Sequence, residues 1–234
     1  MCHKRHPPWT WVVCSRSQQT AWVGTVTLRP PEHGVGSHPG IAFERFTRHG
    51  PVALLPLPPG PKASPGLRQA SLVWCVPSDD DPVAELTDAQ RLVVLQSLIP
   101  PQAGTLTAIS PLKHFALGLN AERSLVSGRT VRIGNAAQTL HPVAGQGLNL
   151  GLRDAYALVQ ALRPTSDLDS ALRHVAWSRN PDRWSMIAAT DFLARSFTWR
   201  WPGLAAARGL GLAALQAFPP VKSALARQMM FGRR

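Results

Sequence analysis

The sequence predicts an α+β fold in which an antiparallel sheet precedes a set of helices. Strand-like stretches separated by loops rich in proline and glycine follow one another between residues 19 and 76. Strands so close in sequence usually pair antiparallel. A glycine-rich loop later leads into a helical pattern at residues 148–162, and the chain beyond Pro164 also has helical periodicity.

Four strands are expected in the first part of the sheet, at residues 21–28, 41–47, 52–57 and 71–76. A proline-rich hairpin at residues 58–65 separates the last two. The segment 1–17 has a basic start and an apolar run too short for a signal-peptide core. It is expected to be a linker or a stretch foreign to the fold.

A turn and a helix follow the fourth strand. The run Asp79-Asp80-Asp81 precedes Pro82 and is predicted to be a solvated turn in preference to a metal cluster. Thr87 and Gln90 have the spacing of a capping box, so a helix is expected from there to Pro100. A further strand is expected where Phe115, Leu117 and Leu119 alternate.

The stretch 129–162 is the most informative part of the chain. A short strand at residues 130–133 opens it, and Pro164 ends the helix that closes it. Apolar residues recur along that helix at steps of four and three, which predicts a single packed face formed by Leu148, Leu152, Ala155, Val159 and Leu162.

The loop before this helix has the composition of a ligand site. Gly145 and Gly147 flank Gln146 where the helix begins, so the backbone can approach a ligand closely. The first N–H groups of a helix lack intrahelical acceptors, and the helix dipole is positive there. An anion or an electron-rich oxygen is therefore expected at this point, with Asn135 and Asn149 as further polar groups.

Two other interpretations of the glycines stay open. Gly145, Gly147 and Gly151 are similar to a dinucleotide fingerprint, but their spacing departs from it, and residues 134–144 make the turn too long. A pyridine-nucleotide dehydrogenase is accordingly a weaker hypothesis. The glycines could also serve only as a helix entry.

The string IGNAAQTLHPVAGQGLNLGLRDAYAL closely resembles the second flavin-binding motif of the FAD-dependent aromatic hydroxylases. Within them it is most similar to the ubiquinone-biosynthesis branch, which includes the 2-octaprenyl-6-methoxyphenol hydroxylase. Gly134-Asn135 stands where the wider superfamily has Gly-Asp, and Gln138 where His is common. The family's substrate-domain sheet is resembled by the string ERFTRHGPVALLPL. The family's approach to the flavin loop is resembled by the string HFALGLNAERSLVSGRTVRIGNAAQ.

The resemblance implies a flavin site and a reaction. Asn135, after Gly134, would meet the ribityl chain, while Pro142 and the backbone from Gly145 through Gln146, Gly147 and Leu148 to Asn149 would border the isoalloxazine ring. The implied cofactor is FAD, with NAD(P)H as electron donor and O2 as co-substrate, and the implied substrate is a polyprenylated phenol. The cofactor supplies this chemistry, so no catalytic side chain is assigned.

The resemblance also implies a division of the chain into four segments. Residues 1–17 are atypical, 18–122 form a substrate-domain-like sheet, 123–163 hold the second FAD-binding motif, and 164–234 form a helical region. No part of the sequence supplies the Rossmann unit that anchors the adenosine half of FAD, so the fold corresponds to the C-terminal portion of the family. We expect a truncated monooxygenase whose activity alone is doubtful. The alternatives are a non-catalytic fragment or scaffold remnant, and one half of a split enzyme.

Charge and composition limit the partners. The formal net charge of +12 is dispersed, without a block of Lys and Arg, so no nucleic-acid partner is expected. Three isolated cysteines suit a reducing compartment such as the cytoplasm. The scattered histidines offer no ligand pair on a helix, so no metal is expected.

The C-terminal segment is basic and apolar. No acidic residue follows Phe192, and Trp199 and Trp201 flank Arg200 before a mostly apolar stretch at residues 204–218. This segment is too interrupted to span a bilayer. It is expected to be an ordinary packed helix or, as the second interpretation, a peripheral contact at the inner face of the membrane. Membership in a ubiquinone-biosynthesis protein complex is a further expectation from the resemblance.

Overall fold

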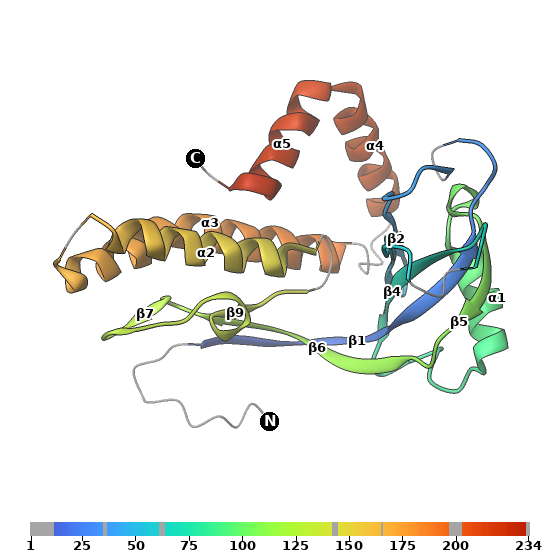
Figure 1. Cartoon of the computed structure of the whole chain (residues 1–234), viewed down its shortest axis with the longest axis horizontal. Coiled ribbons are helices and arrows are strands. Elements are labelled where there is room, and N and C mark those ends of the chain that lie inside the picture. Colours follow the sequence, from blue (N-terminus) through green and yellow to red (C-terminus); the bar gives the residue numbers. More distant parts are fainter. Residues whose placement is uncertain are drawn as a thin grey trace. The chain divides into compact units, whose positions relative to one another are not determined.

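A computed structural model describes residues 12–34, 37–60, 64–141, 145–164, 166–196 and 203–232 of the chain (Figure 1). The chain divides into two compact units. We call Ser17–Leu117 the sheet unit, and Met1–Arg16 together with Gly118–Arg234 the helical unit. The division falls within strands β1 (Val12–Arg29) and β6 (Lys113–Glu122).

The sheet unit is built on antiparallel strand pairs. Besides β1 and β6 it contains β2 (Phe43–Thr47), β3 (Gly50–Pro56), β4 (Arg68–Pro77) and β5 (Thr105–Ile109). The strand order is β2-β3-β4-β1-β6, and β5 also pairs with β1. The pairs β1–β4, β1–β5, β2–β3 and β3–β4 are antiparallel. The predicted antiparallel sheet is confirmed.

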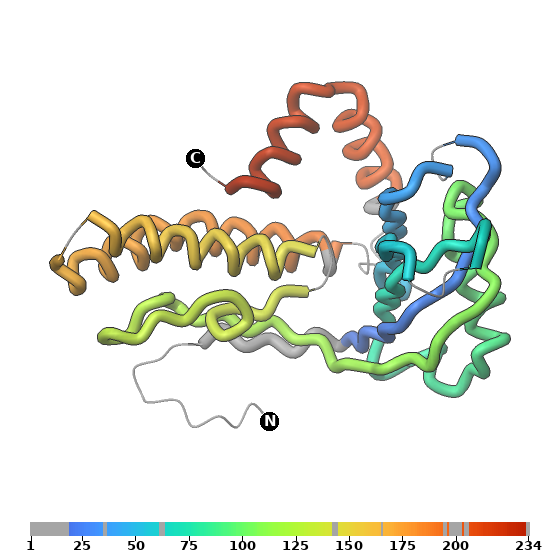
Figure 2. The backbone as a smooth tube through the Cα atoms, in the orientation of Figure 1, coloured from blue at the N-terminus to red at the C-terminus, as the bar shows by residue number. Residues whose placement is uncertain are grey.

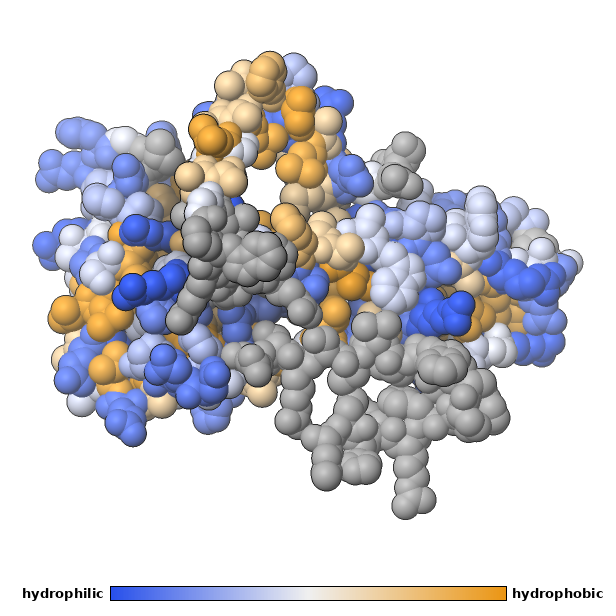
Figure 3. All heavy atoms as spheres, turned by 180° about the vertical axis from the view of Figure 1, so that it is seen from behind, coloured by the Kyte–Doolittle hydropathy of each residue, from blue (hydrophilic) through white to orange (hydrophobic). Residues whose placement is uncertain are grey.

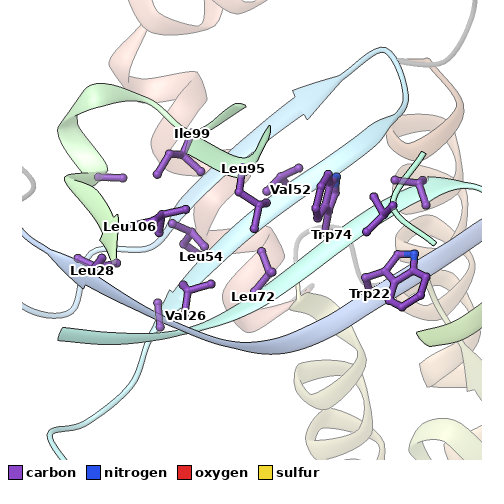
Figure 4. Close-up of a cluster of buried hydrophobic side chains, with 14 residues drawn as sticks. Trp22, Val26, Leu28, Val52, Leu54, Leu72, Trp74, Leu95, Ile99 and Leu106 are labelled. Atoms are coloured by element: carbon purple, nitrogen blue, oxygen red, sulfur yellow. The ribbon is translucent and has the colours of Figure 1, made fainter. Parts of the chain in front are cut away.

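One face of this sheet carries an apolar core. Trp74 lies opposite Trp22 in the register of β1 with β4, and Leu72 lies opposite Leu54 in that of β3 with β4. Side chains at alternate positions point to the same face of a strand. Figure 4 shows that those of β1, β3 and β4 converge with Leu95 and other residues of the neighbouring helical segment. Burial of this surface is the main stabilising contribution to the sheet unit.

Helix α1 (Asp88–Leu98) begins where the sequence predicts it. The capping box is present, because the Thr87 side chain accepts from the Gln90 N–H and the Gln90 side chain accepts from the Thr87 N–H. The chain bends at 78–80, where Asp79 and Asp80 are exposed as predicted. Asp81 is partly buried instead: its Oδ1 accepts from the Val83 N–H at 2.8 Å, and its Oδ2 accepts from Trp22 Nε1 at 2.9 Å. The short helix η2 (Pro101–Ala103) then leads into β5.

In its described residues, the helical unit combines small strands with four helices. Its short elements are β7 (Val126–Ser127), β8 (Thr130–Val131), η3 (Gly134–Ala136) and β9 (Gln138–Thr139). Its helices are α2 (Gln146–Leu162), α3 (Leu168–Ser196), α4 (Leu204–Ala217) and α5 (Pro219–Phe231). Strand β9 pairs antiparallel with the end of β6. Helices α2 and α3 lie side by side (Figure 2).

The buried face of α2 differs from the predicted one. Leu148, Leu152 and Val159 are 72%, 60% and 54% exposed, so the predicted stripe faces outward. The buried side chains are Gln146, Leu150 and Asp154. The buried side of α2 includes polar residues, so a search for regularly spaced apolar residues does not detect it.

One further expectation is corrected. Residues 12–17, which were expected to be linker or foreign sequence, are the start of β1. Helix α3 has 29 residues and buries Arg179 and Arg183. The segments 123–163 and 164–234 both fall in the helical unit, while the four-segment division itself stays a prediction.

Candidate functional site

Two glycines bring the corner after β8 against α2. Gly134 has φ +56°, a left-handed conformation that glycine adopts without steric cost. A Cβ on Gly151 would lie 3.1 Å from the Cα of Gly134, closer than most real Cβ contacts. The absence of side chains at both positions therefore sets how closely the loop approaches the second turn of the helix.

The N-terminus of α2 is also formed by glycine. Gly145 is the N-cap, with φ 59° and ψ 23°, and it makes no side-chain capping bond. At Gly147 a Cβ would meet nothing nearer than Asn135 Oδ1, at 4.0 Å. Asn135 thus lies near the first turn of α2, where N–H groups and the positive end of the helix dipole point the same way.

The structure brings most of the predicted site residues together. Gly134 and Asn135 lie in η3, Gly145 caps α2, and Gln146, Gly147, Leu148 and Asn149 form its first turn. The Gln146 side chain is buried and that of Leu148 is exposed, so of these two only Leu148 presents its side chain to solvent. Pro142 lies outside the described residues. The flavin-binding role of these residues stays a prediction.

His141 is a neutral imidazole in this loop. Burial lowers its pKa from 6.5 to about 4, and the nearby charge of Asp191 opposes that shift only in part. Desolvation disfavours the charged form of a histidine. At neutral pH the side chain of His141 therefore carries no positive charge.

A buried network of charged and polar side chains holds α2 against α3 and β9. We call it the polar seam; its buried members are Glu122, Gln138, Asp154, Arg179, Asp182 and Arg183. Asp154 of α2 accepts from Gln138 Nε2 at 2.8 Å and from Arg179 Nε at 2.9 Å. Both oxygens of a fully buried carboxylate are thereby hydrogen-bonded, which compensates for much of its desolvation.

Arg183 occupies the centre of the polar seam with no exposed surface. It donates from Nε to Gln138 Oε1 at 2.8 Å and from Nη2 to the carbonyl oxygen of Glu122 at 3.0 Å. Burial lowers the pKa of Arg183, whereas the neighbouring carboxylates Asp154 and Glu122 raise it. The guanidinium thus ties helix α3 to both β9 and the end of β6.

Two acidic residues complete the seam. Asp182 pairs with Arg153 of α2 at 3.0 Å and with Arg179 at 2.7 Å. Glu122 pairs with Arg132 at 2.7 Å. The seam therefore holds α2 in place through Arg153 and Asp154. The first turn of α2, beside Asn135, is positioned with the rest of the helix.

Sequence reasoning missed this network, although a signal for it exists. Arg179 and Arg183 lie four residues apart and continue the buried line of Leu172, Val175 and Met186 on α3. Positions three and four apart share one face of a helix. Two arginines on an otherwise apolar face indicate buried charge that needs acidic partners on the neighbouring element.

The sheet unit contains a cavity of about 200 Å³. Its lining includes the apolar residues Leu28, Ile41, Phe43 and Leu54. Arg68, also on the lining, donates to the carbonyl oxygens of His38, at 3.1 Å, and Ser37. Mostly apolar walls with a few fixed polar groups are typical of small-molecule pockets.

Comparisons with known proteins agree with this architecture. The pattern that defines the FAD binding domain family matches residues 15–166. Ubiquinone hydroxylase UbiL of Rhodospirillum rubrum is 34% identical over 219 residues, covering 91% of this chain and 48% of that protein. The mitochondrial ubiquinone biosynthesis monooxygenase COQ6 of Caenorhabditis elegans is 31% identical, covering 79% and 48%. The chain spans about half the length of these curated relatives.

A solved structure shows the same fold. The p-nitrophenol 4-monooxygenase PnpA of Pseudomonas putida aligns with a TM-score of 0.66 at 18% identity, covering 96% of this chain and 56% of that one. The chain belongs to the FAD binding domain family. The relatives named above are ubiquinone-biosynthesis hydroxylases, which supports the predicted family, and the predicted fold class is confirmed.

Proposed function

We propose that this chain contributes the ring-side half of an FAD site to a monooxygenase that hydroxylates a polyprenylated phenol in ubiquinone biosynthesis. The observation that carries the proposal is the juxtaposition of Gly134 with Gly151 and of Asn135 with Gly147 at the N-terminus of α2. An open helix terminus stabilises negative charge, and Asn135 offers polar atoms beside it. The electron-rich edge of a flavin ring fits such a site.

In this proposal the protein binds and orients the cofactor. The backbone of Gly145 to Asn149 would border the ring, Asn135 would meet the ribityl chain, and Pro142 would complete the border. Bound FAD would supply the redox chemistry, with NAD(P)H as donor and O2 as co-substrate. The apolar cavity in the sheet unit has walls that suit the hydrocarbon part of a prenylated substrate.

The proposal extends to location and partners. Within the described residues no helix is both long enough and apolar enough to cross a bilayer. We place the protein in the cytoplasm, in peripheral contact with the inner face of the membrane that dissolves its substrate. A ubiquinone-biosynthesis complex is a further proposed partner; the relatives' names support the pathway alone.

Titration with different flavins tests the proposal. A site that contacts only the ring and the ribityl chain should bind FAD and FMN within about threefold of one another, a difference below about 1 kcal/mol. Quenching of flavin fluorescence by the purified chain measures both affinities. Binding of FAD more than a hundredfold tighter than FMN, about 2.8 kcal/mol, would show that the chain also holds the adenosine half. No quenching by either flavin would overturn the ring-side site.

A second candidate function is that of one half of a split enzyme, which catalyses the reaction only when another polypeptide covers α2. The observation that favours it is the exposed apolar line of Leu148, Leu152, Tyr156 and Val159, each more than half exposed. Apolar surface of this extent commonly marks an interface. Substrate-stimulated NADPH oxidation by the purified chain alone would exclude this candidate.

A further inference from the structure

Helices α4 and α5 form a hairpin whose large apolar side chains are exposed. The two helices contact each other and are joined at Phe218. Leu210 and Leu212 on α4 are 73% and 59% exposed, and Phe218 and Val221 at the turn are 62% and 57% exposed. Figure 3 shows apolar surface gathered over this hairpin, at the top of the view.

Apolar residues surround α4 and do not form a single stripe. Of its 14 residues, LAAARGLGLAALQA, only Arg208 and Gln216 are polar. A helix that is apolar on all sides is normally covered by protein or by lipid. At this length an apolar helix is too short to cross a bilayer, but it suits an interfacial position.

The charges of the hairpin have one sign. Between residues 203 and 232 the charged side chains are Arg208, Lys222 and Arg227, and the sequence holds no Asp or Glu after Asp191. Arg227 is exposed, and Lys222, also exposed, donates to Gln216 Oε1 at 2.9 Å. Protein interfaces usually have a rim that mixes polar groups, whereas an anionic lipid surface attracts cations alone.

The hairpin is fastened at the end opposite its turn. Arg153 of α2 donates from Nη2 to the carbonyl oxygen of Met229 at 3.1 Å, near the end of α5. Arg208, near the start of α4, donates to the carbonyl oxygen of Ser196. The end of the hairpin opposite Phe218 is thus bound to the rest of the helical unit through two arginines. Phe218 and Val221, at the turn between the two helices, stay exposed.

We propose that the α4–α5 hairpin is a membrane-binding element whose partner is an anionic lipid surface. The apolar turn enters the boundary between headgroups and acyl chains, and Lys222 and Arg227 attract the lipid phosphates. The inference rests on the peripheral membrane contact proposed above and deepens it by naming the element and the lipid. It does not depend on the flavin site, because vesicle binding needs no cofactor.

Flotation of the full chain with vesicles tests this proposal. We expect binding to vesicles of phosphatidylcholine and phosphatidylglycerol in equal parts, and much weaker binding to phosphatidylcholine alone. The double variant Lys222→Gln, Arg227→Gln should bind the anionic vesicles about 25-fold more weakly, at about fivefold for each charge. Phe218→Ser should weaken binding about tenfold or more, through lost apolar burial.

Matched controls distinguish binding by the hairpin from nonspecific binding through any exposed apolar side chain or any surface cation. Val93→Ser removes an apolar side chain that is 72% exposed on α1, and Lys113→Gln with Arg173→Gln removes two other exposed cations. Both controls should float like the wild type. Equal binding to both vesicle types, or equal losses in controls and hairpin variants, would overturn the proposal. A dimer that Leu210→Ser dissociates, without vesicle binding, would show that a second copy covers the hairpin instead.

Discussion

The core of the sheet unit and the polar seam of the helical unit hold their elements together by different means. The sheet core consists of apolar side chains on alternate strand positions facing α1. The seam places arginines and carboxylates between α2, α3 and β9. An apolar core tolerates small shifts at modest cost, whereas a buried ion network is stable only with its partners in place. The difference indicates that the seam sets the position of α2 more strictly than the sheet core sets that of its strands.

The largest effect is expected for Asp154→Ala. The change leaves Gln138 Nε2 and Arg179 Nε without their acceptors in a buried site, so the free energy of unfolding should fall by about 3–5 kcal/mol. Asp154→Asn retains one acceptor oxygen and should lose less. Urea denaturation measures both. A loss below about 1 kcal/mol for the alanine variant would contradict the importance given to the seam.

Leu72→Ala tests the other side of the comparison. Leu72 is fully buried in the middle of β4, and its truncation should cost about 2–5 kcal/mol through lost burial and a cavity. Leu55→Ala, at a position 43% exposed on β3, is the matched control and should cost below about 1 kcal/mol. Hydrogen exchange should then show opening of β3 and β4 in the Leu72 variant, with α2 still protected. Equal loss of protection in α2 would show that the two regions are not energetically distinct.

His141 should make stability depend on pH in the acid range. Its pKa is about 4 in the folded protein against 6.5 ordinarily, so the unfolded chain binds more protons between these values. This contribution is complete above pH 6.5, decreases as the pH falls and is gone below about 4. A change of about 2 kcal/mol is expected after allowance for partial solvent exposure. His141→Gln should flatten this part of the profile, and an NMR titration midpoint near 6.5 would contradict the assigned environment.

The smallest effect is expected for an exposed ion pair in the helical unit. Arg129 and Asp169 lie 3.7 Å apart, and their side chains are 76% and 61% exposed. Arg129→Gln should change the free energy of unfolding by less than about 0.5 kcal/mol. Salt should reduce even this difference. A change in the free energy of unfolding as large as that of Asp154→Ala would mean that burial does not determine how much an ion pair contributes to stability.

The two regions also differ in how well the sequence predicts them. The strands and the capping box at Thr87 follow from local patterns, since alternation and capping act between neighbouring residues. The glycines of the site were also recognisable, because Gly145 does adopt a left-handed conformation at the start of α2. These features needed no information from distant parts of the chain.

The buried face of α2 could not be predicted in the same way. Its apolar line at Leu148 and Leu152 is exposed, and its buried line includes Asp154. Asp154 is buried because Arg179, 25 positions later, supplies the pairing charge. A hydropathy pattern assigns charged residues to the surface. It cannot show that two charged residues far apart in the sequence pair with each other in the interior.

One glycine variant tests the central claim, that the first turn of α2 is the ring-side flavin site. At Gly147 a Cβ would meet nothing nearer than 4.0 Å, so Gly147→Val is expected to fold while it covers the N-terminal N–H groups. Gly209→Val on α4, where a Cβ would also meet nothing within 4 Å, is the matched control. In a fluorescence-quenching titration with FAD, we expect a loss of affinity of at least about tenfold, or 1.4 kcal/mol, for Gly147→Val alone. Equal affinities for wild type, Gly147→Val and Gly209→Val would contradict the claim.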